Sequence, residues 1–267
     1  MTKEYKELTF TDDFVFGKVL TTNTELCKEL LELILDKKIA DIKYVESQKT
    51  LKQTYESKGI RLDVLVENEN TIYDIEMQTT FQKDLPKRAR YYQGMIDLNL
   101  IESGMNYERL KKSYIIFICT KDPFGKGFPV YSSKTVFRED ESIIYDDMTR
   151  VIFLNAAGSR TGLSQNMCAF LDFLQNQKVS NNLTEKLASE VLRVKENKKW
   201  SVEYMNMATL LADTSREREI LGSIKALLRQ KFGREQICAD IKEEFRLNDA
   251  EIEDYIAQAK KELNNRK

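Results

Sequence analysis

Two acids and one amide stand out in this chain because they lie in two short apolar segments. Asp63 interrupts the segment R-L-D-V-L-V-E-N, and Glu76 and Gln78 end the segment I-Y-D-I-E-M-Q. Successive side chains of a strand point to opposite sides, so Asp74, Glu76 and Gln78 should share one face. Carboxylates that lean together from adjacent strands can share one hard divalent cation. Without a cation or water to neutralise it, such an acidic face is costly to bury.

Residues 58–78 read as two strands joined by a short Asn-rich turn. A turn that closes symmetrically over Asn68 and Glu69 predicts Asp63 opposite Asp74 and places Arg61 across from Glu76. Asp63 and Glu76 are then diagonal neighbours, with Cβ atoms roughly 7–8 Å apart. The hairpin therefore predicts a pair of carboxylates within reach of one metal ion.

This pair has the arrangement that a metal-dependent phosphodiesterase needs. Asp63 and Glu76 are the candidate metal ligands, and the backbone carbonyl of Met77 can add a third oxygen. Two acids suffice to bind Mg²⁺, because this ion keeps several of its waters, and Mn²⁺ is the expected substitute. The metal would neutralise charge that builds up on the phosphorane and would activate a water for attack. Gln78 can orient that water by hydrogen bonding, although it carries no positive charge.

Composition removes several competing kinds of chemistry. The 267 residues include no histidine, which excludes Ser-His and Cys-His triads and the HExxH proteases. The four cysteines are far apart with no CxxC spacing, so they predict buried thiols rather than a zinc site. A net charge of −1 means that a nucleic-acid partner would need a local basic patch.

No apolar run approaches the roughly 18 residues of a membrane span, and the N-terminus MTKEYKELTF has no secretory pattern. We therefore expect a cytoplasmic protein without a membrane partner.

Periodicity predicts the elements that position this hairpin. Residues 9–20 are expected to form a cap followed by a short helix. A helix capped by Thr24 is expected over 25–36, followed by a strand over 39–48. After the hairpin, Asp84 and Pro86 predict the start of a helix over 86–102. Its first turns are basic, with Lys87 and Arg88, and Arg88 shares a helix face with Tyr92, four residues later.

The second half begins with strands and ends with helices. The apolar run 114–120 predicts a central strand covered on both faces. Asp122–Pro129 predicts a structured loop, which lacks the GxxxxGK[ST] spacing of a phosphate-binding loop. Further strands are expected over 133–138 and 150–155. Helices are expected over 163–174, 184–195, 200–212 and 217–232, with Gly233 as a C-cap, and over the last segment, which begins at Leu247.

This order of elements, together with the motifs, resembles the PD-(D/E)XK nuclease superfamily. More specifically, the chain resembles its transposase-associated, recombination-promoting branch, over about residues 8–215. The resemblance is carried by FTDDFVFGKVL, RLDVLVEN, IYDIEMQ, RARYYQGMID, the DPFGKG loop, VIFLNAAG and KKWSVEYM. The expected fold is α/β, with a restriction-endonuclease-like core (helix, three strands, helix, strand), a mixed central sheet and a helical C-terminal extension.

The resemblance also implies roles for individual residues. Asp63 and Glu76 would be metal ligands, and Gln78 stands where the wider superfamily has lysine. Arg88 and Tyr92 match the RxxxY part of the helix after the motif and would face phosphate or brace the site. Arg61 and Lys87 are expected to contact DNA or brace the site, and Asp13, in the N-terminal DDF segment, has a peripheral role.

Two hypotheses follow. In the first, residues 1–160 form a nuclease-like domain that hydrolyses DNA with Mg²⁺ during transposition or recombination. Residues 161–267 then form a helical region that packs or self-associates into a homo-oligomer. In the second, the same fold is catalytically degenerate and acts as a DNA-binding or protein-interaction module. A conventional DDE transposase is disfavoured because no third acid stands in a matching context.

Overall fold

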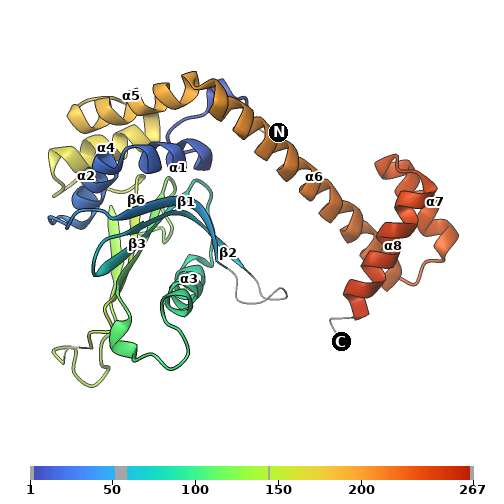
Figure 1. Cartoon of the computed structure of the whole chain (residues 1–267), viewed down its shortest axis with the longest axis horizontal. Helices are drawn as coiled ribbons and strands as arrows, with labels where there is room; N and C mark the ends of the chain where they lie inside the picture. The colour runs from blue at the N-terminus through green and yellow to red at the C-terminus, as the bar shows by residue number, and fades with distance from the viewer. Residues whose placement is uncertain (1–2, 52–58, 144, 265–267) are drawn as a thin grey trace. The chain divides into compact units, whose positions relative to one another are not determined.

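The chain folds as an α/β protein around one mixed six-stranded sheet, shown in Figure 1 as a computed structural model. The structure describes residues 3–51, 59–143 and 145–264. In spatial order the strands are β1 (Tyr44–Leu51), β2 (Ile60–Glu67), β3 (Thr71–Gln78), β4 (Lys112–Cys119), β6 (Thr149–Asn155) and β5 (Val130–Ser133). β3, β4 and β6 are parallel, and the other neighbours are antiparallel. The predicted α/β class with a mixed sheet is confirmed.

Helices cover both faces of this sheet (Figure 1). One face carries α3 (Leu85–Leu100), and the opposite face carries α1 (Asp13–Thr22), α2 (Thr24–Leu35), α4 (Gln165–Asn176) and α5 (Asn182–Glu196). Under α3, Ala89, Met95 and Ile96 pack with Phe117 and other sheet residues. β4 is buried from Ser113 to Cys119, as predicted for a strand covered on both sides.

The hairpin of β2 and β3 forms, but the predicted register is wrong. Asn68 donates its N–H to the carbonyl of Thr71, so the turn is centred on Glu69 and Asn70, one residue later than expected. This moves every pair by two positions, and Asp74 lies opposite Leu65 instead of Asp63. Continued by one pair, the register brings Asp63 opposite Glu76. Lys58, the first residue of the predicted hairpin, lies outside the described ranges.

Pairing between β1 and β2 is interrupted at the level of Asp63. Ser47 pairs with Val64 and Lys49 with Leu62, but the intervening Gln48 has a left-handed φ of 56°. A non-glycine residue in this conformation stores strain and is common next to functional sites. The strand β1 itself lies later than the predicted range 39–48.

The start of α3 and the loop after β4 are both close to their predicted form. α3 begins at Leu85, with Pro86 in its first turn, so the predicted helix is confirmed except that it ends at Leu100. In the loop after β4, the carboxylate of Asp122 accepts hydrogen bonds from the backbone N–H groups of three residues, Phe124, Gly125 and Gly127. These bonds confirm the prediction of a structured loop.

Several predicted boundaries need correction. The first α-helix follows its cap and begins at Asp13, as expected, but it continues to Thr22, two residues beyond the predicted end. Asn23, not Thr24, caps α2, because its Oδ1 accepts the N–H of Leu26. β5 ends at Ser133, where a strand was expected to begin.

The C-terminal region is more continuous than predicted. α6 (Lys198–Arg229) is one helix where two were expected, because the polar residues 213–215 contain no proline or glycine to break it. Gly233 does not cap its end; it has φ −70° and precedes α7 (Arg234–Phe245), a helix that the sequence analysis missed. The last predicted helix is confirmed as α8 (Asp249–Asn264).

The described chain forms two compact units, Lys3–Lys198 and the segment that begins at Lys199. α4 and α5 belong to the first unit, and the domain division at residue 160 stays a prediction. The second unit has its own aliphatic core on α6, α7 and α8, which includes Ile224, Ile241 and Ile256. Across the described ranges, every helix is too short or too polar to cross a membrane.

Candidate active site

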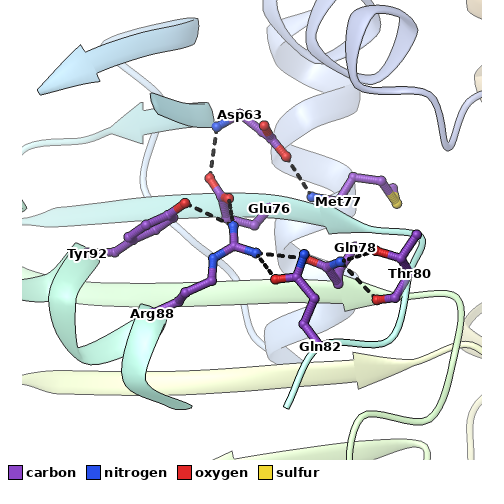
Figure 2. A network of polar contacts seen from close by, with 8 residues as sticks. All are labelled: Asp63, Glu76, Met77, Gln78, Thr80, Gln82, Arg88 and Tyr92. Atoms are coloured by element: carbon purple, nitrogen blue, oxygen red, sulfur yellow. Dashed lines mark hydrogen bonds and ion pairs between the residues drawn. The ribbon is translucent and has the colours of Figure 1, made fainter. Parts of the chain in front are cut away.

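Asp63 and Glu76 meet where the β2–β3 ladder ends, and each carboxylate accepts a backbone N–H of the opposite strand. The backbone N–H of Asp63 donates to Glu76 Oε1 at 2.8 Å, and the N–H of Met77 donates to Asp63 Oδ2 at 3.0 Å (Figure 2). These crossed bonds follow the last regular pair, Val64 with Ile75. The two candidate ligands are therefore held together by backbone of the opposite strand, a rigid arrangement that does not depend on long side chains.

Arg88 brings a positive charge to these acids from the first turns of α3. Its Nη2 lies 3.4 Å from Glu76 Oε2 and donates to the hydroxyl of Tyr92 at 2.9 Å. Its Nη1 donates to Gln78 Oε1 at 3.0 Å and to Gln82 Oε1 at 2.7 Å. The predicted i, i+4 relation of Arg88 and Tyr92 is present, and Figure 2 shows Arg88 at the centre of the network.

Gln78 is fixed at both ends of its amide. Its Nε2 donates to the backbone carbonyl of Thr80 at 2.9 Å and to Thr80 Oγ1 at 3.1 Å, while Oε1 accepts from Arg88. In this position Gln78 orients the Arg88 guanidinium. Sequence reasoning missed Thr80 and Gln82; their place in the short connection between the Glu76–Gln78 motif and α3 was the available signal.

A cleft of about 740 Å³ opens beside this network. Of the predicted site residues, Asp13, Arg61, Asp63, Met77, Gln78, Lys87, Arg88 and Tyr92 line it. Glu76 is only 2% exposed and lies beneath the wall of the cleft. Asp13, Arg61 and Lys87 are exposed at the cleft without a direct bond to Asp63 or Glu76 among the described contacts. The structure thus brings the predicted positions to one cleft, and Glu76 is the most deeply buried of them.

Asp74 adds a third acid to the site, and it was not among the predicted site residues. Its side chain is fully buried, and neither carboxylate oxygen has a hydrogen-bond partner within the described part of the chain. Strand alternation placed it on the same face as Glu76, so the signal was present in the sequence.

Burial makes the charged forms of these acids expensive. Burial, with the nearby Asp13 carboxylate, raises the pKa of Asp63 to about 6. Burial also raises the pKa of Asp74 and that of Glu76 well above their usual ranges. Repulsion from Asp63 adds to both shifts, and repulsion from Asp74 adds to that of Glu76. Arg88 opposes the shift at each of the three acids but does not cancel it.

These residues fit a hard divalent cation. Across the described ranges, no three Asp, Glu, Cys or His side chains form a ready metal cage. Mg²⁺ does not require one, because it is bound by one or two carboxylates and keeps several waters. Asp63 lines the cleft, and its Oδ1 receives no hydrogen bond from the described residues, whereas Oδ2 is held by Met77. A cation beside Asp63 and Glu76 would also stabilise their charged forms, which burial and, to a smaller extent, neighbouring acids disfavour.

Comparison with known proteins identifies a family for this chain. A family model described as PD-(D/E)XK nuclease family transposase matches residues 10–226 of the chain. The match includes the sheet, α3 and all the site residues above. Searches among curated proteins and among solved structures found no match.

Proposed function

The chain belongs to the PD-(D/E)XK nuclease family transposases, and from this membership we propose that it is a metal-dependent DNA endonuclease acting in transposition or recombination. The family's nuclease chemistry implies DNA as substrate and a restriction-endonuclease-like arrangement of the core. One observation carries the proposal: Asp63 and Glu76 lie together at the end of the β2–β3 ladder, with Arg88 against them, beside an open cleft.

The proposed metal would be Mg²⁺, with Mn²⁺ as substitute, held by Asp63, Glu76 and the carbonyl of Met77. When bound, it would supply a water of lowered pKa and neutralise charge that develops on the phosphate. The protein's own residues would do the rest. Arg88 would contact the reacting phosphate, because four hydrogen bonds to residues of the site hold its guanidinium beside the acids.

Gln78 and Tyr92 are proposed as positioning residues for Arg88. The motif position that is lysine in the wider superfamily is uncharged here, and the guanidinium bonded to Gln78 Oε1 supplies the missing positive charge. The remaining lone pair of that oxygen can still accept a bond from the attacking water. Arg61 and Lys87, exposed at the cleft, would hold flanking phosphates.

A second function has a specific observation in its favour. Both oxygens of Glu76 are already engaged, one by the N–H of Asp63 and one by Arg88, and the third motif position lacks a charge. A nuclease fold in this state could bind DNA or another protein without cleaving. Metal binding separates the two functions, because the degenerate alternative does not need it.

The test is cleavage of supercoiled plasmid by the purified full chain with Mg²⁺, Mn²⁺ or EDTA. Asp63→Asn and Glu76→Gln keep the size of each side chain and should abolish nicking, as EDTA should. Glu102→Gln, at an exposed acid outside the cleft, is the matched control and should cleave normally. Full activity in Asp63→Asn or Glu76→Gln would refute the proposal.

A further inference from the structure

A second cavity lies on the other side of the first turns of α3, away from the acids. It has a volume of about 430 Å³ and is enclosed by α3, the loop after β4, and the strands β5 and β6. This size is within the range of small-ligand pockets, about 300–1,000 Å³. The family match assigns it no role.

Three aromatic rings form the floor of this cavity. Phe124 makes edge-to-face contacts with Tyr131, at 4.9 Å between ring centroids, and with Phe153, at 5.0 Å. Tyr131 is held in place because its hydroxyl donates to Asp122 Oδ1 at 2.9 Å. Phe124 remains 39% exposed. Phe124 is therefore held by its two ring neighbours while part of its surface stays exposed, and such a ring can stack on a flat, partly polar ligand.

The charge at the rim is positive. Arg90 from α3 and Lys134 after β5 line the cavity and are exposed, and no acid lines it within the described ranges. Three acids lie behind the wall and bond to lining residues: Asp97 accepts from Gln93, Asp122 from Tyr131, and Asp147 from Thr135 and Thr149. Asp147 is also paired with Arg150 at 3.8 Å. The cavity therefore favours an anionic ligand with an aromatic part.

α3 connects this cavity to the acidic cleft. Lys87 and Arg88 line the cleft, whereas Pro86, Ala89 and Arg90 line the second cavity. Helix side chains advance by about 100° per residue, and a helix with its side chains is about 10–12 Å across. The two sites are thus separated by about the width of one helix, which a nucleic-acid strand crosses in a few nucleotides.

We propose that this cavity binds an unpaired nucleobase of the DNA strand whose scissile phosphate lies in the acidic cleft. The base stacks on Phe124, and its flanking phosphates contact Arg90 and Lys134. This inference rests on the proposed nuclease function and names its substrate class: duplex DNA with a single-stranded overhang or flap.

The cavity should accept any base. Gln93, its one side-chain amide, donates to Asp97 and accepts from Ser113, and the lining threonine hydroxyls donate to Asp147. The lining serine hydroxyls can both donate and accept, so they discriminate little between bases. Stacking without hydrogen-bond readout tolerates all sequences, because every base has a π-face.

The experiment measures fluorescence anisotropy of a labelled duplex with a single-stranded overhang and of the same duplex with blunt ends, in EDTA so that no cleavage occurs. Wild type should bind the overhang substrate about tenfold tighter, the size of one base–aromatic stack. Phe124→Ala should remove this preference. Ser133→Trp should remove it as well, by filling the cavity from an exposed position on the same strand face as Tyr131.

Arg90→Ala with Lys134→Ala should lower affinity for the overhang more than for the blunt duplex, whereas the exposed Lys178→Ala is the control for loss of charge and should change neither. Equal affinity of wild type for both substrates, or an unchanged preference in Ser133→Trp, would overturn the inference and leave the cavity to a different apolar ligand or a peptide strand. Because binding is read in EDTA, the outcome is separate from that of the plasmid assay. A nuclease without overhang preference refutes only this inference. A preference without cleavage refutes the nuclease and the scissile phosphate in the cleft, and leaves only base binding in the cavity.

Discussion

The two units of the chain bury different kinds of side chain. The core of the unit formed by α6, α7 and α8 is aliphatic, and all the buried polar residues identified in the described ranges lie in the first unit. Three of these, Asp74, Glu76 and Gln78, lie on one face of a single strand. Burying carboxylates that repel one another costs stability. The second unit shows that this chain can form a core from aliphatic side chains alone. Buried acids that cost stability are typical of functional sites, so the acids of β3 indicate a role in chemistry rather than in packing.

After the acid pair itself, the largest effect should come from Arg88, the cation that joins the acids to Gln78. Arg88→Met should lower the single-turnover cleavage rate by about 10²–10³-fold, the range for loss of one charge-stabilising donor. Arg88→Lys should recover part of the rate, because it restores the charge without the two-pronged geometry. A rate in Arg88→Met within twofold of wild type would show that the guanidinium only braces the site.

In the second unit a substitution should change stability and leave chemistry intact. Ile224 is fully buried in the aliphatic core of α6, α7 and α8. Ile224→Ala should lower the free energy of unfolding of this unit by about 2–5 kcal/mol, as measured by denaturant titration. The plasmid cleavage rate at low temperature should stay unchanged. If Ile224→Ala lowered both the free energy of unfolding and the cleavage rate, the two units would act as one.

The raised pKa of Asp63 should make the stability of the first unit depend on pH. Its folded pKa of about 6 lies above the value near 4 of an unfolded chain, so the folded state binds more protons between these values. Stability should therefore fall as pH rises through this window. Asp63→Asn removes the effect. In EDTA its Tm should equal that of wild type near the lower limit and exceed it by several degrees above pH 6, as measured by scanning fluorimetry. A constant difference across this range would contradict the assignment.

The smallest effect concerns self-association through the helical C-terminal region, which stays a prediction. α6 exposes apolar side chains that a monomer does not need, including Met205 and Leu210. Light scattering coupled to size exclusion should show a lower mass for Met205→Glu with Leu210→Glu than for wild type. The same mass for both, at concentrations where wild type is an oligomer, would assign the contact to another surface.

Much of the first unit could be predicted from local patterns. The two strand patterns with their alternation predicted Asp63 and Glu76 as a pair, whereas the place of Arg88 beside them followed from the family resemblance rather than from a local pattern. The register of the hairpin could not be predicted, because it depends on which carbonyl accepts the N–H of Asn68, and in the structure this is the carbonyl of Thr71. The sequence allows turns centred one residue apart, and this choice moves every pair by two positions.

The remaining differences arise from long-range packing. The depth of Asp74 depends on how α3 covers the sheet, so its fully buried state has no local signature. The continuity of α6 through the polar residues 213–215 is set by the absence of a strong breaker rather than by an apolar stripe. The aromatic cavity combines segments from residues 86 to 153, which no short motif joins.

The most direct test of the account is whether a divalent cation binds at the buried acids. Thermal unfolding of the full chain should be followed at pH 8 in EDTA and in excess Mg²⁺ or Mn²⁺. A cation that binds only the folded state raises Tm by mass action. The account predicts this shift for wild type and for Glu102→Gln, and its loss in Asp63→Asn. The same metal-dependent shift in Asp63→Asn as in wild type would contradict it.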